Sequence, residues 1–442
     1  MAPIRLSLLV AAYPTITAAL FLAFQRLRPP FLQRIIAGQH GGRLAYSTSA
    51  LGLARTAKAL GAVGDGGLAF GGGAAVGGPA GGAAGSGGAA GPAGTAAPGA
   101  AAAGGRGRPA EFSYAVGMAC QAKRASAQRA MASLRVRGAD RPNSGEDSFF
   151  YTQLGDTSAH ALGVIDGVGG WCEVGVDATE FSHSLAVAME SIAPAVVGAP
   201  AAGDVASRVA ASKFAFAPLV LLDTAYTMIK SSGQVEAGGS TACVGVATAG
   251  GVLQTANLGD SGYAIVRNGS LLYASQPQTH FFNAPFQLSI IPESMLAEDE
   301  RQGGRHFGDE PADAVLATHT LRHGDVVMFC TDGLLDNLAP TDYLAIINKS
   351  MVAGGCWARD AGGRLGPAPD LPDRARDAVD LAAANLVDAA LRASLDTKTD
   401  GPFALEAQQK MRFPYRGGKP DDITVLVLLA QQQSDGSVRV RL

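Results

Sequence analysis

The sequence predicts an α+β fold in which two antiparallel β-sheets pack face to face and α-helices flank them on the outside. Short strand-like runs dominate residues 111–442 and are joined by turn signals. Asn268-Gly269, between two apolar runs, is the strongest short-range indication of a β-hairpin. The helical patterns fall in two groups, one after the early strands and one before the final strand. Strands joined by hairpins form antiparallel sheets rather than a parallel doubly wound sheet.

The individual elements follow from hydrophobic periodicity. Strands are expected where short apolar or β-branched runs end at a glycine or an acidic residue, at 112–120, 147–154, 160–166, 240–248, 251–260, 262–273, 314–321, 325–332 and 422–430. Helices are expected where apolar residues recur with the longer helical period, at 178–192, 204–231, 340–349 and 373–395.

Residues 1–64 have the composition of an organellar targeting segment. They contain no acidic residue, whereas Arg recurs and Ser and Thr are common, which is typical of a transit peptide. The stretch "RLAYSTSALG" at 43–52 resembles a mitochondrial processing site, so we predict a mitochondrial location, with the chloroplast as the alternative. Residues 6–25 are uncharged and about as long as a membrane span. They are either an apolar targeting helix that is removed, which we favour, or a retained helix that associates the protein with a membrane.

Residues 65–110 are predicted to be a disordered linker. Between Gly71 and Gly105, 29 of 35 residues are Gly or Ala, and the others are Val, Pro, Ser or Thr. Such a segment has no large side chain to bury, so it cannot offset the conformational entropy that ordering would cost. The folded domain is therefore expected to begin near Glu111 and to extend over 111–442.

The charge of the chain is strongly asymmetric, although the formal net charge is only −3. Residues 1–110 carry nine Lys and Arg against one acid, Asp65, which gives +8 and leaves 26 basic and 37 acidic residues, or −11, in 111–442. An acidic body opposes nucleic-acid binding, because phosphates require clustered Lys and Arg, whereas it suits divalent cations. The five cysteines form no C-x-x-C pair, which indicates a reducing compartment and argues against disulfides or a zinc site.

Several predicted strands end at an Asp that lies next to a glycine or a second acid. Asp166 in "VIDGVGGW", Asp260 in "NLGDSGY" and Asp332 in "FCTDGLLDN" each follow an apolar run. A carboxylate at the edge of a core is costly unless it is paired or bound to a metal. Mg²⁺ and Mn²⁺ prefer oxygen ligands, and glycines beside the acids would let ions and a phosphate approach the main chain. Each motif alone fits a simple turn, but the set predicts a centre for hard divalent cations.

Six motifs occur in order across 111–442: G-E-D, D-G-x-G-G, G-S-T-A, N-x-G-D-S, T-D-G-x-x-D and D-D-I-T-V. This set resembles the type 2C metal-dependent serine/threonine protein phosphatases. "DGVGGW" and "QTHFFNAPFQLS" resemble the organellar branch of that family, which includes the mitochondrial phosphatase linked to coenzyme Q biosynthesis and its plant and algal relatives. The resemblance implies a catalytic domain over 111–442 with an αββα sandwich, which hydrolyses phosphoserine and phosphothreonine in phosphoprotein substrates. We expect a monomer.

The resemblance also implies a role for individual residues. Two Mg²⁺ or Mn²⁺ ions would share Asp166 as a bridging ligand, and a hydroxide between the ions would attack the phosphorus. Asp260 would hold a weaker third ion. The predicted catalytic residues are Asp166, Asp332 and Asp421, and the predicted metal ligands are Glu146, Asp147, Asp166, the carbonyl of Gly167, Asp332, Asp421 and Asp260.

The sequence departs from the family pattern at a few positions. Val168 replaces a His that protonates the leaving oxygen in many members, and we expect either His280 or a water to take that role, although a structural His280 is the alternative. Arg141 is the candidate for phosphate binding, but it lies five residues before Glu146 rather than four, and an exposed loop Arg is the alternative. Asp422 stands where many members have Asn.

Two other functions remain open from the sequence. A non-catalytic phosphatase-like binding protein would typically have lost metal ligands, whereas every matching acidic position is filled here. The missing His keeps that alternative open. A metal-dependent phosphodiesterase would use the same carboxylates, but the acidic body argues against a nucleic-acid substrate.

Overall fold

The structure of the chain is a computed structural model that describes residues 111–123, 141–155, 157–197, 216–301, 308–369, 371, 375–412 and 414–433. The predicted targeting segment 1–64, with its apolar stretch 6–25, and the predicted linker 65–110 lie outside the described residues. Among the described helices, none combines the length and the hydrophobicity that crossing a bilayer requires.

Two five-stranded antiparallel sheets form the centre of the fold. Sheet A has the order β1-β16-β13-β7-β8, with β1 at Phe112–Gln121, β16 at Ile423–Gln432, β13 at Val326–Cys330, β7 at Gly262–Arg267 and β8 at Ser270–Ala274. Sheet B has the order β12-β6-β5-β3-β2, with β12 at Val315–Thr320, β6 at Val252–Leu258, β5 at Ala242–Ala247, β3 at His160–Ile165 and β2 at Ser148–Gln153. In sheet A the last strand, β16, pairs with the first, β1, along its whole length.

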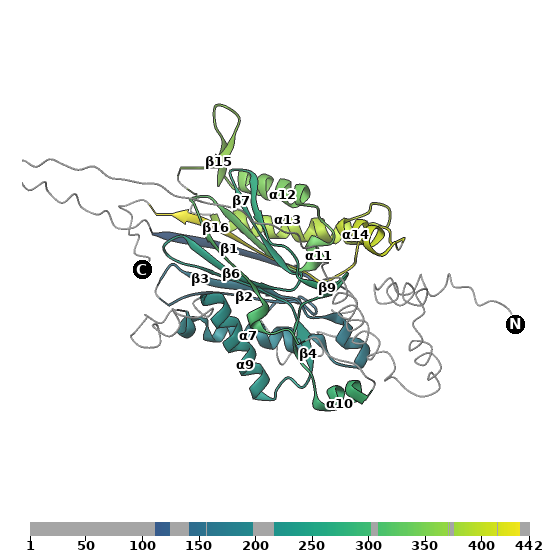
Figure 1. Cartoon of the computed structure of the whole chain (residues 1–442). Helices are drawn as coiled ribbons and strands as arrows, with labels where there is room; N and C mark the ends of the chain where they lie inside the picture. Colours follow the sequence, from purple (N-terminus) through teal and green to yellow (C-terminus); the bar gives the residue numbers. More distant parts are fainter. Residues whose placement is uncertain are drawn as a thin grey trace, which may run out of the picture.

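The two sheets pack face to face, with helices on both outer faces (Figure 1). Helices α12 (Pro340–Ala353) and α13 (Ala375–Leu395) cover sheet A, and α7 (Ala178–Val196) and α9 (Ala217–Ser232) cover sheet B. The central strands, such as β5, β13 and β16, therefore bury one face between the sheets and the other under helices, which explains why they are apolar on both faces. The predicted αββα sandwich is confirmed. The layer between the sheets is formed by side chains such as Phe149, Leu162, Tyr263, Phe329 and Leu426.

Most of the predicted elements are present. The expected hairpin connects β7 to β8. Its turn is formed by Asn268 (φ 51°) and Gly269 (φ 77°), which both lie in the left-handed region. The expected helix 204–231 corresponds in its second half to α9, and its first residues lie outside the described ones. The strand expected at 240–248 is divided into β4 (Gly238–Ser240), which pairs with β11 (Leu288–Ile290), and β5.

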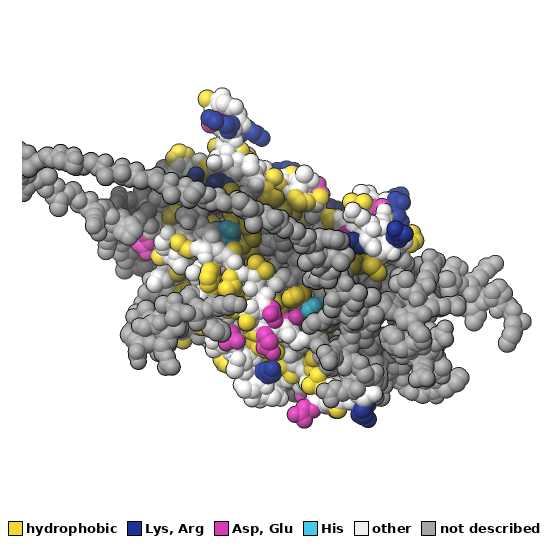
Figure 2. All heavy atoms as spheres, viewed as in Figure 1, with side chains coloured by type: hydrophobic (Ala, Val, Ile, Leu, Met, Phe, Trp, Pro, Cys, Tyr) yellow, Lys and Arg dark blue, Asp and Glu magenta, His cyan; other side chains and the backbone are white. Residues whose placement is uncertain are grey.

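Several short elements were not predicted. They are the hairpin of β9 (Thr279–Phe281) and β10 (Ala284–Pro285), the hairpin of β14 (Trp357–Arg359) and β15 (Leu365–Pro367), the helices α10 (Glu293–Arg301), α11 (Asp332–Leu335) and α14 (Pro402–Met411), and the 3₁₀ turns η1 (Gly169–Val174) and η3 (Pro311–Asp313). The β14–β15 hairpin projects from the helical layer over sheet A (Figure 1). Figure 2 shows basic side chains at its tip and around α14, and acidic side chains beside a histidine near β9.

Candidate metal centre

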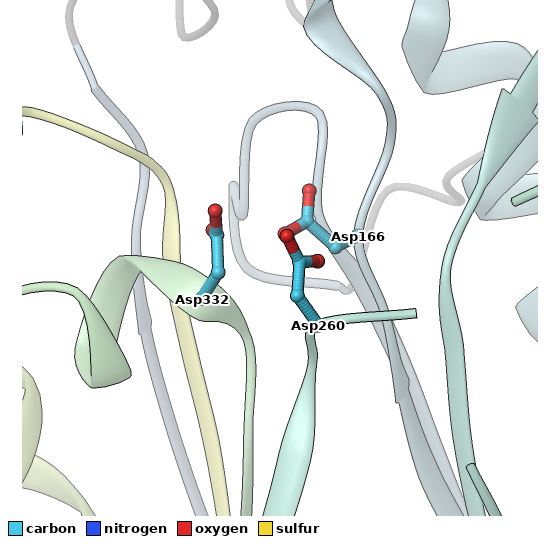
Figure 3. Close-up of side chains that lie close together, drawn as sticks. All are labelled: Asp166, Asp260 and Asp332. Atoms are coloured by element: carbon cyan, nitrogen blue, oxygen red, sulfur yellow. The ribbon is translucent and has the colours of Figure 1, made fainter. Parts of the chain in front are cut away.

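Asp166, Asp260 and Asp332 meet at one end of the sandwich. Asp166 follows β3, Asp260 lies two residues after β6, and Asp332 begins α11 two residues after β13, so both sheets contribute. One carboxylate oxygen from each residue lies within 4.8 Å of the other two. Figure 3 shows the three side chains reaching a common space. All the donors are carboxylate oxygens, which is the donor set that hard divalent cations prefer, so these residues fit such an ion.

The other predicted carboxylates lie next to these three. The Glu146–Asp147 pair precedes β2 and the Asp421–Asp422 pair precedes β16. The Glu146 backbone N–H donates to Asp422 Oδ2 (2.9 Å), and the Thr331 hydroxyl donates to Asp147 Oδ2 (2.8 Å). These hydrogen bonds connect the segment just before β2 to the segment just before β16 and to the residue after β13.

Burial and mutual repulsion shift the pKa values of these carboxyl groups. Burial, and then the charges of Asp332 and Asp147, raise the pKa of Asp166 well above its ordinary value. Burial, and then Asp332, raise the pKa of Asp260 to about 7. Burial opposes ionisation of Asp421 as well, but the ammonium groups of Lys123 and Lys419 outweigh it and lower the pKa of Asp421. The group as a whole holds more negative charge than its two lysines balance, which is the electrostatic condition for binding divalent cations.

Sequence reasoning missed the two lysines and Asp336. The Lys419 ammonium lies 2.6 Å from Asp332 Oδ2, 2.5 Å from Asp336 Oδ2 and 3.2 Å from Asp421 Oδ2. The Lys123 ammonium lies 2.8 Å from Asp421 Oδ1 and 3.2 Å from Glu146 Oε2. Asp336 lies in the T-D-G-x-x-D motif, and Lys419 lies directly before "PDD". The sequence motifs could therefore have indicated both residues. Lys123 had no such signal, because its partners lie far away along the chain.

Two glycines near the carboxylates are required for close packing of the segments that carry them. The Gly167 backbone N–H donates to the Glu146 carbonyl (3.1 Å), and a Cβ at Gly167 would lie 2.4 Å from that carbonyl oxygen. Gly145 has φ +74°, and a Cβ there would lie 2.2 Å from Asp422 Oδ1. These glycines allow the segments that carry the carboxylates to approach one another closely.

Comparison with known proteins identifies the family. No protein-family model matches the chain. It is 33% identical over 296 residues to "Protein phosphatase 2C homolog 7, mitochondrial" of Saccharomyces cerevisiae, an alignment that covers 66% of this chain and 76% of the relative. The chain belongs to the protein phosphatase 2C family. It is also 34% identical over 284 residues to "Protein phosphatase PTC7 homolog fig" of Drosophila simulans, which covers 64% of this chain and 76% of that one.

The predicted enzyme class is thereby confirmed, since members of the protein phosphatase 2C family are metal-dependent serine/threonine protein phosphatases. A solved structure of the photosystem II phosphatase PBCP is also similar, with 23% identity, a TM-score of 0.49, and coverage of 72% of this chain and 99% of that one.

The structure gives Arg141 partners on sheet B and α7. Its guanidinium donates to the Phe149 carbonyl (2.7 Å) and pairs with the Glu190 carboxylate of α7, and it lies over the Phe149 ring. A role of Arg141 in phosphate binding stays a prediction.

The His280 side chain also has partners of its own. Its Nε2 lies 2.8 Å from Asp309 Oδ2, and its ring stacks on Phe286 with 4.2 Å between the centroids. Its strand does start beside the centre, because the Gln278 backbone N–H donates to the Gly259 carbonyl (2.8 Å), directly before Asp260. A role of His280 as proton donor stays a prediction. Val168 packs into an apolar cluster with Trp171 and Ala178, so its side chain contributes to packing.

Proposed function

We propose that this chain hydrolyses phosphoserine and phosphothreonine in phosphoproteins at a centre of two Mg²⁺ or Mn²⁺ ions. The observation that carries the proposal is the convergence of Asp166, Asp260 and Asp332 from two sheets, with their oxygens within 4.8 Å of one another. The residues that would hold the two ions are Glu146, Asp147, Asp166, Gly167 through its carbonyl, Asp332 and Asp421, and Asp260 would hold a weaker third ion.

Divalent ions bound there would lower the pKa of a water toward neutrality and neutralise the charge of the phosphoryl group. The protein supplies a fixed arrangement of carboxylates for this chemistry. Thr331 orients Asp147 through a 2.8 Å hydrogen bond, and the Lys419 ammonium holds Asp332 and Asp421. Because these groups are already positioned, little reorganisation accompanies the reaction.

The proposal is tested by measuring phosphate release from a phosphothreonine peptide and from p-nitrophenyl phosphate, with Mn²⁺, with Mg²⁺ and with EDTA. We expect turnover that requires either metal. Bis(p-nitrophenyl) phosphate serves as the diester control and should be a poor substrate. A folded protein that releases no phosphate with either metal would contradict the proposal and favour a binding protein.

We further propose a mitochondrial location. The acid-free, Arg-containing segment 1–64 supports it, and the yeast relative is named mitochondrial. Imaging of the full-length tagged chain, with N-terminal sequencing of the mature form, tests it. A plastid signal would support the alternative location, and retention of residues 6–25 in the membrane fraction would support membrane association. Light scattering of the purified protein tests the proposed monomer.

A further inference from the structure

Lys123 is joined to the carboxylate centre by both its backbone and its side chain. It lies two residues after β1, and its backbone N–H donates to Asp422 Oδ1 (2.7 Å). Its ammonium lies 2.8 Å from Asp421 Oδ1, 3.2 Å from Glu146 Oε2 and 3.8 Å from Asp422 Oδ2. The Lys123 ammonium therefore lies where the predicted metal ligands that precede β2 and β16 come together.

The two lysines at the centre differ in their access to solvent. The Lys419 side chain is 9% exposed, contacts three carboxylates, and is covered by the Phe403 ring, whose centroid lies 5.2 Å from its ammonium. The Lys123 side chain is 27% exposed. Lys123 is therefore the more accessible of the two lysines to a phosphate that enters from solvent.

Hydrolysis of a phosphate ester requires a cation that balances the charge on the phosphoryl oxygens as the bond to the leaving group breaks. Arg141, the candidate from the sequence, is bound to Glu190 and to the Phe149 carbonyl. Moving its guanidinium to a phosphate would break both contacts and leave the Glu190 carboxylate without this partner.

We propose that Lys123 is the residue that binds the substrate phosphate, and is thus a further catalytic residue. The inference rests on the phosphatase function proposed above. In the structure the ammonium is held by Glu146, Asp421 and Asp422. Once bound divalent cations compensate those carboxylates, their attraction for the ammonium falls and a phosphate oxygen becomes its strongest partner. A lysine suits this role as a point charge for phosphate.

The test compares Lys123→Gln, Lys123→Arg and Arg141→Gln with the wild type in the full-length chain with Mn²⁺. Lys410→Gln, on the exposed face of α14, is the matched charge control. The measurements are kcat and KM for p-nitrophenyl phosphate, the inhibition constant of inorganic phosphate, and Mn²⁺ affinity by calorimetry. A charge-assisted hydrogen bond contributes about 1.5–3 kcal/mol, so we expect Lys123→Gln to weaken phosphate inhibition by about 10- to 100-fold.

Lys123→Arg should recover part of the phosphate affinity, and Lys123→Gln should bind Mn²⁺ at least as tightly as the wild type, because a competing positive charge is gone. A merely structural lysine would instead lose Mn²⁺ affinity together with phosphate affinity. The inference is overturned if Lys123→Gln matches Lys410→Gln, or if Arg141→Gln is the variant that loses phosphate. If Lys123→Gln does not fold, Lys123→Arg and Arg141→Gln provide the test. The inference is also overturned if the inhibition constant of inorganic phosphate is unchanged in Lys123→Arg and is weakened in Arg141→Gln. A wild type without turnover contradicts the proposed function, and calorimetry with inorganic phosphate on the Mn²⁺-loaded protein then still tests Lys123.

Discussion

The Lys419 ammonium lies 2.6 Å from Asp332 Oδ2, so a residue of the loop before β16 holds the first residue of α11. The Lys419 backbone is fixed as well, because its N–H donates to Asn337 Oδ1 and its carbonyl accepts from Asn337 Nδ2, both at 2.9 Å. Lys419 is thus an internal counter-cation in a fixed position.

Replacing Lys419 by Met should therefore destabilise the metal-free protein. The substitution leaves the partly buried Asp332 and Asp336 without the ammonium of Lys419, and breaking a buried pair costs up to about 3–5 kcal/mol. Chemical denaturation in EDTA measures the free energy of unfolding. Lys410→Met, which breaks an exposed pair with Glu406, is the control and should change it by less than about 1 kcal/mol. Equal effects of the two substitutions would contradict the assigned role of Lys419.

Asp166→Asn should lower kcat by more than about 100-fold while the protein stays folded, because a proposed metal ligand is lost. Burial and the neighbouring carboxylates raise the pKa of Asp166, so removing its charge should also leave the metal-free protein at least as stable. Phosphatase assays and circular dichroism measure these effects. Asp388→Asn, an exposed residue of α13 that pairs with Arg392, should behave like the wild type. Near-normal activity of Asp166→Asn would disprove the metal role.

Gly167→Ala and Gly170→Ala form a pair of substitutions three residues apart, the first just before η1 and the second within it. A Cβ at Gly167 would lie 2.4 Å from the Glu146 carbonyl oxygen, whereas a Cβ at Gly170 has no heavy atom within 4 Å. We expect Gly167→Ala to lower the free energy of unfolding by about 1–3 kcal/mol and to reduce activity, because Glu146 must move. Thermal denaturation and Mn²⁺ titration measure this. If Gly170→Ala is equally damaging, the close approach to Glu146 is not the reason for the glycine.

The stability of the metal-free protein should fall as pH rises toward neutrality. Asp260 has a pKa of about 7 in the fold against an ordinary value of 3.8, so between these values the folded state binds more protons than the unfolded state. The raised pKa values of Asp147 and Asp166 act in the same direction. The lowered pKa of Asp421 makes stability increase with pH instead, but this contribution changes only at pH values below about 4.

Thermal unfolding in EDTA and in Mn²⁺ tests this pH dependence. The rise in Tm on adding Mn²⁺ should be larger at about pH 7.5 than at about pH 5.5, because protons compete with the metal at lower pH. Asp260→Asn should flatten the dependence in EDTA. A metal-free Tm that increases from about pH 5.5 to pH 7.5, and does so equally in Asp260→Asn, would contradict the assignment.

The sequence was sufficient for most of the strand and helix order. It also indicated the three acids that converge, because Asp166, Asp260 and Asp332 each follow an apolar run at the end of a strand. It was not sufficient to predict which basic residues pair with the carboxylates of the centre. Lys123 meets Asp421 across 298 positions, and only the pairing of β1 with β16 brings them together. The ion pair of Arg141 was missed for a related reason, since its partner Glu190 lies on α7, which packs against β2, and no local pattern indicates that contact.

The pairing of β1 with β16 also affects when the enzyme becomes active. The strand that opens the domain has its sheet partner at the far end of the domain, and the same C-terminal stretch delivers Asp421 and Lys419 to the centre. A ribosome, which releases the chain from its N-terminus, therefore completes almost the whole domain before this sheet can close. We therefore expect catalysis to begin only after β16 has been synthesised, and we expect a chain that ends before β16 to be inactive.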